Sequence, residues 1–284
     1  EMSSEAIRNA LIQLYSPSTS NQVKEEVEKQ LSNFKTHPDA FPFAVQTLKS
    51  HQQNASEYDL YLLYYVGSIL EEVVVKKWAL LPQSERQRLR HLLFTFNIES
   101  WNKVPKWVIT KLCKVTVDIG KYTWIIEDDY LSEVLSLVKN HGTRVCGLFL
   151  LGLTVEEFTK GDLLLLSSRK KEIQNGLKAA LPLLFHLLTS IINESLSSSS
   201  ADLEISSEVL KSTMRVIEVL LGWAEMSNAA SPELLSALLK IVEVAAGSSG
   251  RGVTGECGCH AISCVNEILG KRLVPRELQP LVVE

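Results

Sequence analysis

The sequence predicts an all-α protein, an α-solenoid of HEAT-like antiparallel helix-pair repeats. Amphipathic helical patterns separated by short loops recur along the whole chain, with a period of about 40 to 50 residues. Helix-capping residues stand at many of their ends, and no segment shows a convincing β-strand pattern. We therefore expect about five complete helix pairs and one unpaired helix, arranged as a right-handed superhelix.

The other predicted helices are organised around residues 56–78. This segment opens with a Ser-x-x-Asp capping box, Ser56 and Asp59, which satisfies free N–H groups at a helix start. Its apolar residues have the spacing of one helical face: Leu63, Val66, Ile69, Leu70, Val73 and Val74. A helix this apolar must be covered by its neighbours.

Three shorter helices are expected before this segment and one directly after it. The first covers residues 4–14, and the second follows a Thr19-x-x-Gln22 capping box. The second ends at His37-Pro38, because proline disfavours the α conformation in the residue before it. Asp39 then caps the third helix, and the helix after the long segment begins at Pro82.

The remaining helices have similar signals. We expect them at residues 105–118, 124–139, 143–158, 168–195, 207–225, 231–246 and 258–269. Gly120 is expected just past the first of these, and Gly176 and Pro182 are expected to kink the longest. Ser231 is the predicted N-cap of the helix that begins at Pro232. Residues 195–202 form a serine-rich insert, and Pro275 begins a further helix.

Composition excludes several classes of function. The 284 residues carry a net charge of −4, which favours neither a broad nucleic-acid surface nor an anionic membrane as partner. Residues 179–192 are the most apolar segment, but they are fewer than the roughly 20 that span a bilayer, and we see no signal peptide. Four of the five cysteines fall on apolar helical faces, which favours a reducing compartment: Cys113, Cys146, Cys259 and Cys264.

Two motifs suggest cofactor or metal chemistry, and we reject both. Gly250, Gly252 and Gly255 fit G-x-G-x-x-G, but a helix rather than a strand precedes them, so a loop between helices is the better interpretation. Structural zinc sites use paired clusters, and the group of Cys257, Cys259, His260 and Cys264 lacks a second pair. We expect packed thiols there, and no metal or other cofactor.

No set of residues has the pattern of a catalytic site, so we expect no enzyme. The histidines lie among leucines or at helix ends, without a nucleophile motif beside them. The acidic run at residues 127–129 is interpreted as a helix first turn, where carboxylates stabilise the helix dipole. Arg86, Arg88, Arg90 and His91 form a basic helix face in solvent, which is either an ordinary solvated face or a patch for an acidic partner.

Several stretches resemble the importin-β superfamily. They are the Lys-Lys-Trp end of the long helix (residues 76–78), His-Pro-Asp-Ala followed by an aromatic residue (37–41), KLCKVTVDIG with a later tryptophan (111–124), LLGLTVEE (150–157) and AISCVNEIL (261–269). Together they resemble exportins, and in particular the subfamily that carries profilin–actin out of the nucleus. The chain departs from the exportin pattern at Ile125, where proline is usual, and in its serine-rich insert.

This resemblance implies a shuttling nuclear export receptor with importin-β N-terminal repeats at residues 1–100 and exportin-type HEAT repeats at 101–284. It implies binding to Ran-GTP, to protein cargo such as profilin–actin, and to phenylalanine-glycine repeats of the nuclear pore. Ran would contact the second helices of the first repeats, expected at residues 39–53, 82–96, 127–139 and 168–195. The candidate Ran-binding residues are Arg86, Arg90, His91, Lys170 and Lys171. The alternative is a HEAT or armadillo scaffold unrelated to nuclear transport.

The same patterns predict which large side chains are buried between helices. We expect Trp78, Leu112, Cys113, Trp223 and Cys264 in the core. Trp78 should close the end of its long helix against the helix that follows.

Overall fold

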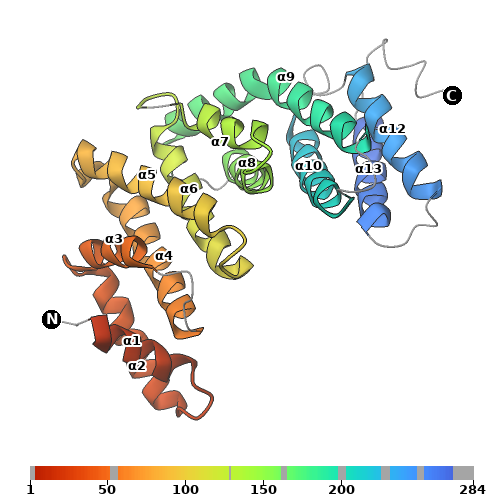
Figure 1. Ribbon diagram of the computed structural model, residues 1–284. Helices are drawn as coiled ribbons and strands as arrows, with labels where there is room; N and C mark the ends of the chain where they lie inside the picture. The colour runs from red at the N-terminus through yellow and green to blue at the C-terminus, as the bar shows by residue number, and fades with distance from the viewer. Residues whose placement is uncertain are drawn as a thin grey trace. The chain divides into compact units, whose positions relative to one another are not determined.

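The computed structural model describes residues 4–51, 57–127, 129–160, 165–197, 203–224, 231–247 and 253–270. These residues form twelve α-helices, one short 3-10 helix and no β-strand, which confirms the all-α prediction (Figure 1). The helices belong to two compact units, Glu1–Thr123 and Trp124–Glu284. The predicted domain boundary at residue 100 and the right-handed superhelix stay predictions.

The first unit is built around its long central helix. Its elements are α1 (Ser4–Tyr15), α2 (Asn21–Thr36), α3 (Ala40–Ser50), α4 (Glu57–Lys77), η1 (Trp78–Leu80), α5 (Gln83–Ser100) and α6 (Lys106–Thr123). Helix α4 packs against α1, α2, α3 and α6, while α5 packs against α3 and α6. The unit therefore has one layer containing α1, α4 and α6, and another containing α3 and α5 (Figure 1).

The predicted apolar face of α4 is the core of this unit. All six of its predicted residues are buried: Leu63, Val66, Ile69, Leu70, Val73 and Val74. Gly67 lets α6 approach closely, since a β-carbon there would lie 2.8 Å from Cγ of Lys111. On the side of α2, the hydroxyl of Tyr65 donates a 2.7 Å hydrogen bond to the carbonyl of Leu31.

The second unit repeats the two-layer arrangement. Its helices are α7 (Tyr130–Lys139), α8 (Arg144–Thr159), α9 (Ser167–Ser197), α10 (Leu203–Trp223), α12 (Pro232–Gly247) and α13 (Val253–Gly270). Helix α10 packs against α8 and α13, and α9 packs against α12. Contacts of α7 with α8, α9 with α10, and α12 with α13 join the layers into helix pairs, as expected for HEAT-type repeats.

Two predicted boundaries were wrong. Helix α6 continues through the buried Gly120 to Thr123. Helix α9 spans Ser167–Ser197 as one helix that includes Gly176 and Pro182, as predicted, and the kink there stays a prediction. Helix α7 begins at Tyr130 rather than at Trp124, because Ile125 has a φ of 74°, a left-handed conformation that ends helical geometry. Trp124 is nevertheless fixed, since its ring stacks on Phe158 with centroids 5.5 Å apart.

The observed helix caps match the predicted caps only in part. Ser231 is the N-cap of α12 as predicted, and its hydroxyl accepts a 3.2 Å hydrogen bond from the N–H of Leu234. The Thr19 capping box was wrong, because α2 begins at Asn21 after Ser20, which makes no side-chain cap bond. Asp39 holds the predicted N-cap position of α3, also without a side-chain bond.

Some predicted features lie outside the described residues or begin elsewhere. Ser56, the end of the serine-rich insert (198–202), the glycines at 250 and 252, and Pro275 are outside the described residues. Helix α13 begins at Val253, five residues before the predicted start, so Gly255 belongs to a helix instead of a loop.

Four of the five predicted core residues are buried. Trp78, Leu112, Cys113 and Cys264 are at most 5% exposed. Trp223, the last residue of α10, is only half-buried. Trp78 lies in η1, directly after the long helix that it was predicted to close.

Candidate functional site

The basic residues of α5 differ in their environments. His91 is exposed as predicted, whereas Arg86 and Arg90 are half-buried instead of fully solvated. The guanidinium of Arg90 lies 5.8 Å from the ring centroid of Phe94, one turn further along the helix. Arg88 is exposed and forms a 3.0 Å ion pair with Glu85. The α5 cations therefore combine partly desolvated guanidinium groups with exposed charges.

The predicted cations of α9 lie at its first turn. Lys170 is half-buried and Lys171 is exposed. Arg169 beside them has a structural role, because it donates a 2.6 Å hydrogen bond to the carbonyl of Trp124 and pairs with Glu172 at 2.7 Å. The structure thus leaves Lys171 as the more accessible charge of this group.

The candidate Ran-binding residues share a layer within each unit. Arg86, Arg90 and His91 lie on α5, in the layer of α3 and α5. Lys170 and Lys171 lie on α9, in the layer that also contains α12. These helices correspond to two of the predicted second helices, those at residues 82–96 and 168–195.

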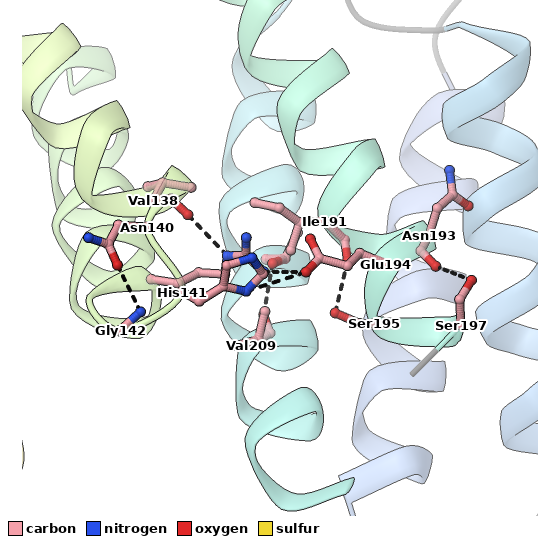
Figure 2. Close-up of polar contacts among 12 residues, drawn as sticks. Val138, Asn140, His141, Gly142, Ile191, Asn193, Glu194, Ser195, Ser197 and Val209 are labelled. Atoms are coloured by element: carbon pink, nitrogen blue, oxygen red, sulfur yellow. Dashed lines mark hydrogen bonds and ion pairs between the residues drawn. The ribbon is translucent and has the colours of Figure 1, made fainter. Parts of the chain in front are cut away.

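Another group of charges joins the turn between α7 and α8 to the end of α9 (Figure 2). Arg144 is buried, and its Nε donates a 3.1 Å hydrogen bond to the carbonyl of Val138. One of its terminal nitrogens lies 3.1 Å from a carboxylate oxygen of Glu194, and Nδ1 of His141 lies 3.4 Å from the same oxygen. These contacts stabilise the packing of α8 on α9 and bring no nucleophile to the histidine.

The cysteine and histidine group around α13 is mostly core. Burial raises the pKa of the Cys257 thiol, and it raises the pKa of Cys264 to about 12. Cys259 is exposed, which corrects its predicted place on an apolar face. Nδ1 of His260 lies 2.9 Å from a carboxylate oxygen of Glu218. Among the described residues, no group of three or more potential ligands could hold a metal ion.

Sequence reasoning missed an aromatic pocket in the first unit. Tyr15 at the end of α1, Tyr61 and Tyr64 of α4, and Trp107 of α6 line a cavity of about 510 Å³, together with Leu60. A signal was present in the sequence, since Tyr61 and Tyr64 are three residues apart on one face of α4. That face differs from the buried face used to predict the helix.

One helix among the described residues, α9, is long and apolar enough to cross a membrane by length and composition. In the structure its apolar residues pack against other helices of its unit. Those buried are Ile173, Leu177, Leu181, Leu184, Phe185, Leu188, Ile191 and Ile192. These buried residues are the packing surface of α9 within its unit, and the absence of membrane insertion stays a prediction.

The chain is similar to known proteins along nearly its whole length. Residues 27–98 match the importin-beta N-terminal domain, and residues 105–264 match the family described as exportin 1-like protein. Over 98% of the chain, it is 24% identical to Exportin-6 of Homo sapiens and 23% identical to Exportin-6-A of Xenopus laevis and to Exportin-6 of Dictyostelium discoideum. The chain spans only 29%, 30% and 28% of the length of these three relatives, respectively.

Proposed function

Because this chain belongs to the exportin 1-like family of the importin-β superfamily, we propose that it acts in nuclear export by binding Ran-GTP together with a protein cargo. One observation carries the proposal. An importin-β N-terminal domain at residues 27–98 is followed directly by an exportin 1-like region at residues 105–264. Members of this family are nuclear export receptors rather than enzymes.

The proposed cargo is profilin–actin. Similarity to Exportin-6 over 98% of the chain supports this choice, together with the sequence stretches that resemble that subfamily. Ran-GTP and cargo would each raise the affinity for the other, as coupled binding requires. The receptor would shuttle between nucleus and cytoplasm and would contact phenylalanine-glycine repeats during passage through the pore.

The residues proposed to bind Ran are Arg86, Arg90 and His91 of α5 and Lys170 and Lys171 of α9. Their position on one layer within each unit supports the assignment. Exposed Lys171 would steer an acidic partner by long-range attraction, and exposed His91 would offer a hydrogen-bonding contact. Half-buried Arg86 and Arg90 would add short-range contacts, since partly desolvated arginines are frequent among residues that dominate binding energy.

The direct test is nucleotide-dependent binding of the 284-residue chain to Ran. Immobilised Ran is loaded with GDP or with a GTP analogue that resists hydrolysis, and binding is measured with and without profilin–actin. We expect binding to the GTP form only, strengthened by the cargo. Equal affinity for the two nucleotide states would contradict the proposal. It would favour the alternative, an interaction scaffold unrelated to transport, which no observation favours at present.

A further inference from the structure

The aromatic pocket is a continuous row of rings contributed by three helices. Tyr15 of α1 stacks on Tyr61 of α4, with centroids 4.1 Å apart and an angle of 12° between the planes. Trp107 of α6 lies 5.6 Å from Tyr61 and 5.5 Å from Tyr64, at angles of 38° and 50°. Tyr15, at one end of the row, is 44% exposed and Trp107, between Tyr61 and Tyr64, is 43% exposed, so both rings present much of their surface to a ligand.

The polar ends of these rings are available for hydrogen bonding. Within the described part of the chain, the hydroxyls of Tyr15 and Tyr64 and the indole N–H of Trp107 have no hydrogen-bond partner. Other tyrosines of the same unit differ, because Tyr65 and Tyr122 donate to main-chain carbonyls. Burial, with smaller effects of Tyr64, Tyr61 and Glu28, raises the pKa of Tyr15, so its hydroxyl stays protonated at neutral pH.

Among the described charges beside the pocket, two carboxylates are paired with cations and Glu28 is not. Lys111, whose Nζ lies 5.8 Å from the Tyr64 ring centroid, forms an ion pair with Glu71. Asp59, next to Leu60 in the sequence, pairs with Arg8. Glu28 of α2 is exposed and makes no ion pair with any other described residue, and it acts electrostatically on Tyr15. The pocket therefore combines a neutral aromatic surface with the negative charge of Glu28, which acts electrostatically on Tyr15.

We propose that this aromatic pocket binds a proline-rich segment of a partner protein in the polyproline II conformation, with a basic residue of that segment beside Glu28. Such a segment has flat apolar rings and carbonyl groups without internal hydrogen bonds, which match a row of aromatic rings carrying free donors. Its preformed helix loses little conformational entropy on binding. A basic residue complements the charge of Glu28.

This site is independent of the proposed Ran contacts. The pocket is formed by α1, α4 and α6, whereas the candidate Ran-binding residues of the same unit belong to α5. Partner and Ran could therefore bind the first unit together. The inference would stand if Ran binding failed, and the two are tested by separate measurements.

Isothermal titration calorimetry of the 284-residue chain tests the proposal. The probe is a blocked ten-residue peptide with P-x-x-P spacing and one terminal arginine, and its control has every proline replaced by glycine. We expect saturable binding at one site by the proline peptide and at least tenfold weaker binding by the glycine peptide. A Phe-Gly repeat peptide and a trimethyl-lysine peptide, tested in parallel, are expected to bind more weakly than the proline peptide.

Three substitutions assign the binding to this pocket. Trp107→Ala removes a central ring, and we expect a loss of about 30-fold, as for a residue that dominates an interface. Tyr64→Phe keeps the ring and removes one donor, with an expected loss of about fivefold. Glu28→Gln should weaken binding of the arginine-bearing proline peptide by about two- to fivefold. Trp101→Ala, a half-buried tryptophan outside the pocket, is the matched control and should bind like the parent.

Circular dichroism melts establish whether each variant is folded. If Trp107→Ala is unfolded, the peptide affinity of Tyr64→Phe tests whether the pocket is the binding site. The proposal is overturned if the proline and glycine peptides bind equally, or if the pocket variants bind like the parent. It is also overturned if the Phe-Gly or trimethyl-lysine peptide binds more tightly than the proline peptide, which would assign the pocket to that class of ligand.

Discussion

A β-carbon on Gly147 of α8 would lie 2.6 Å from the main-chain nitrogen of Val138 in α7. Real β-carbons do not approach other atoms this closely, and the atoms in the way belong to the backbone rather than to a flexible side chain. The close packing of α7 on α8 therefore depends on the missing side chain at Gly147. Next to this turn, Arg144 at the start of α8 makes the contact with Glu194 of α9 described above.

Substitution of Gly147 should therefore destabilise the chain. For Gly147→Ala we expect a loss of about 1–3 kcal/mol in the free energy of unfolding, because α7 and α8 must move apart. Gly222→Ala is the matched control, since nothing lies within 4 Å of a β-carbon there and it lies within α10. It should stabilise the chain by up to about 1 kcal/mol through helix propensity. Urea unfolding followed by circular dichroism measures both, and equal effects would contradict the packing argument.

Charge reversal on α5 should weaken binding to Ran-GTP. For Arg86→Glu with Arg90→Glu we expect a loss of about 5- to 30-fold at low salt, and a weaker salt dependence. Because both side chains are half-buried, the melting temperature should fall as well, unlike that of a fully solvated pair. Biolayer interferometry over a range of salt concentrations measures the binding.

The exposed candidates separate binding from stability. His91→Glu with Lys171→Glu should reduce the association rate without changing the melting temperature, because both residues are exposed. Arg88→Glu, an exposed charge reversal on the same helix, is the control and should bind more nearly like the parent. If the Arg86/Arg90 and His91/Lys171 double variants both bind like the parent, the Ran contact lies on other residues.

One of the five thiols should react rapidly in the native chain. Cys259 is exposed, whereas Cys113, Cys146, Cys257 and Cys264 are buried. Burial raises the pKa of Cys146 and of Cys264 to about 12, so at pH 8 these groups stay protonated and unreactive. Titration with Ellman's reagent should give one equivalent in native buffer and five in denaturant. The rapid reaction should vanish in Cys259→Ser, and two or more rapid equivalents would show that the buried thiols are accessible.

Trp78 should contribute strongly to stability. The side chain is 5% exposed in η1, between α4 and α5, so Trp78→Ala should cost about 3–5 kcal/mol. Trp223→Ala is a useful comparison, because this half-buried ring should cost less. Urea unfolding gives both values. A loss below about 1 kcal/mol for Trp78→Ala is typical of surface positions and would refute the burial of this ring.

Most of the fold was predictable because helix signals are local. The 3.6-residue period placed the buried face of α4, and Ser231 with Pro232 placed the start of α12. The errors occurred where tertiary packing outweighs local preference. Gly120 was expected to follow a helix end, but here it is buried inside the continuous α6. No single-residue preference indicates the positive φ of Ile125, which delays the start of α7.

The candidate sites were less predictable because exposure depends on contacts between elements. A charged side chain on a helix face predicts exposure to solvent, yet Arg90 lies over the ring of Phe94 and is half-buried. The aromatic pocket combines side chains of α1, α4 and α6, and the sequence alone does not specify how these helices pack together. Tyr61 and Tyr64 show their common face, but Tyr15 and Trp107 join them only in the folded chain.

The two-layer packing also has a consequence for the way this chain folds. Within each unit, consecutive helices form pairs, such as α3 with α4, α7 with α8 and α12 with α13, and other contacts, such as α4 with α6, skip one helix. Contacts between elements at such short separations favour fast folding, since little loop-closure entropy is lost before they form. In such an array a helix pair can nucleate by itself and then propagate to its neighbours. During synthesis on the ribosome, the helices around α4 can therefore acquire their core before the second unit has emerged.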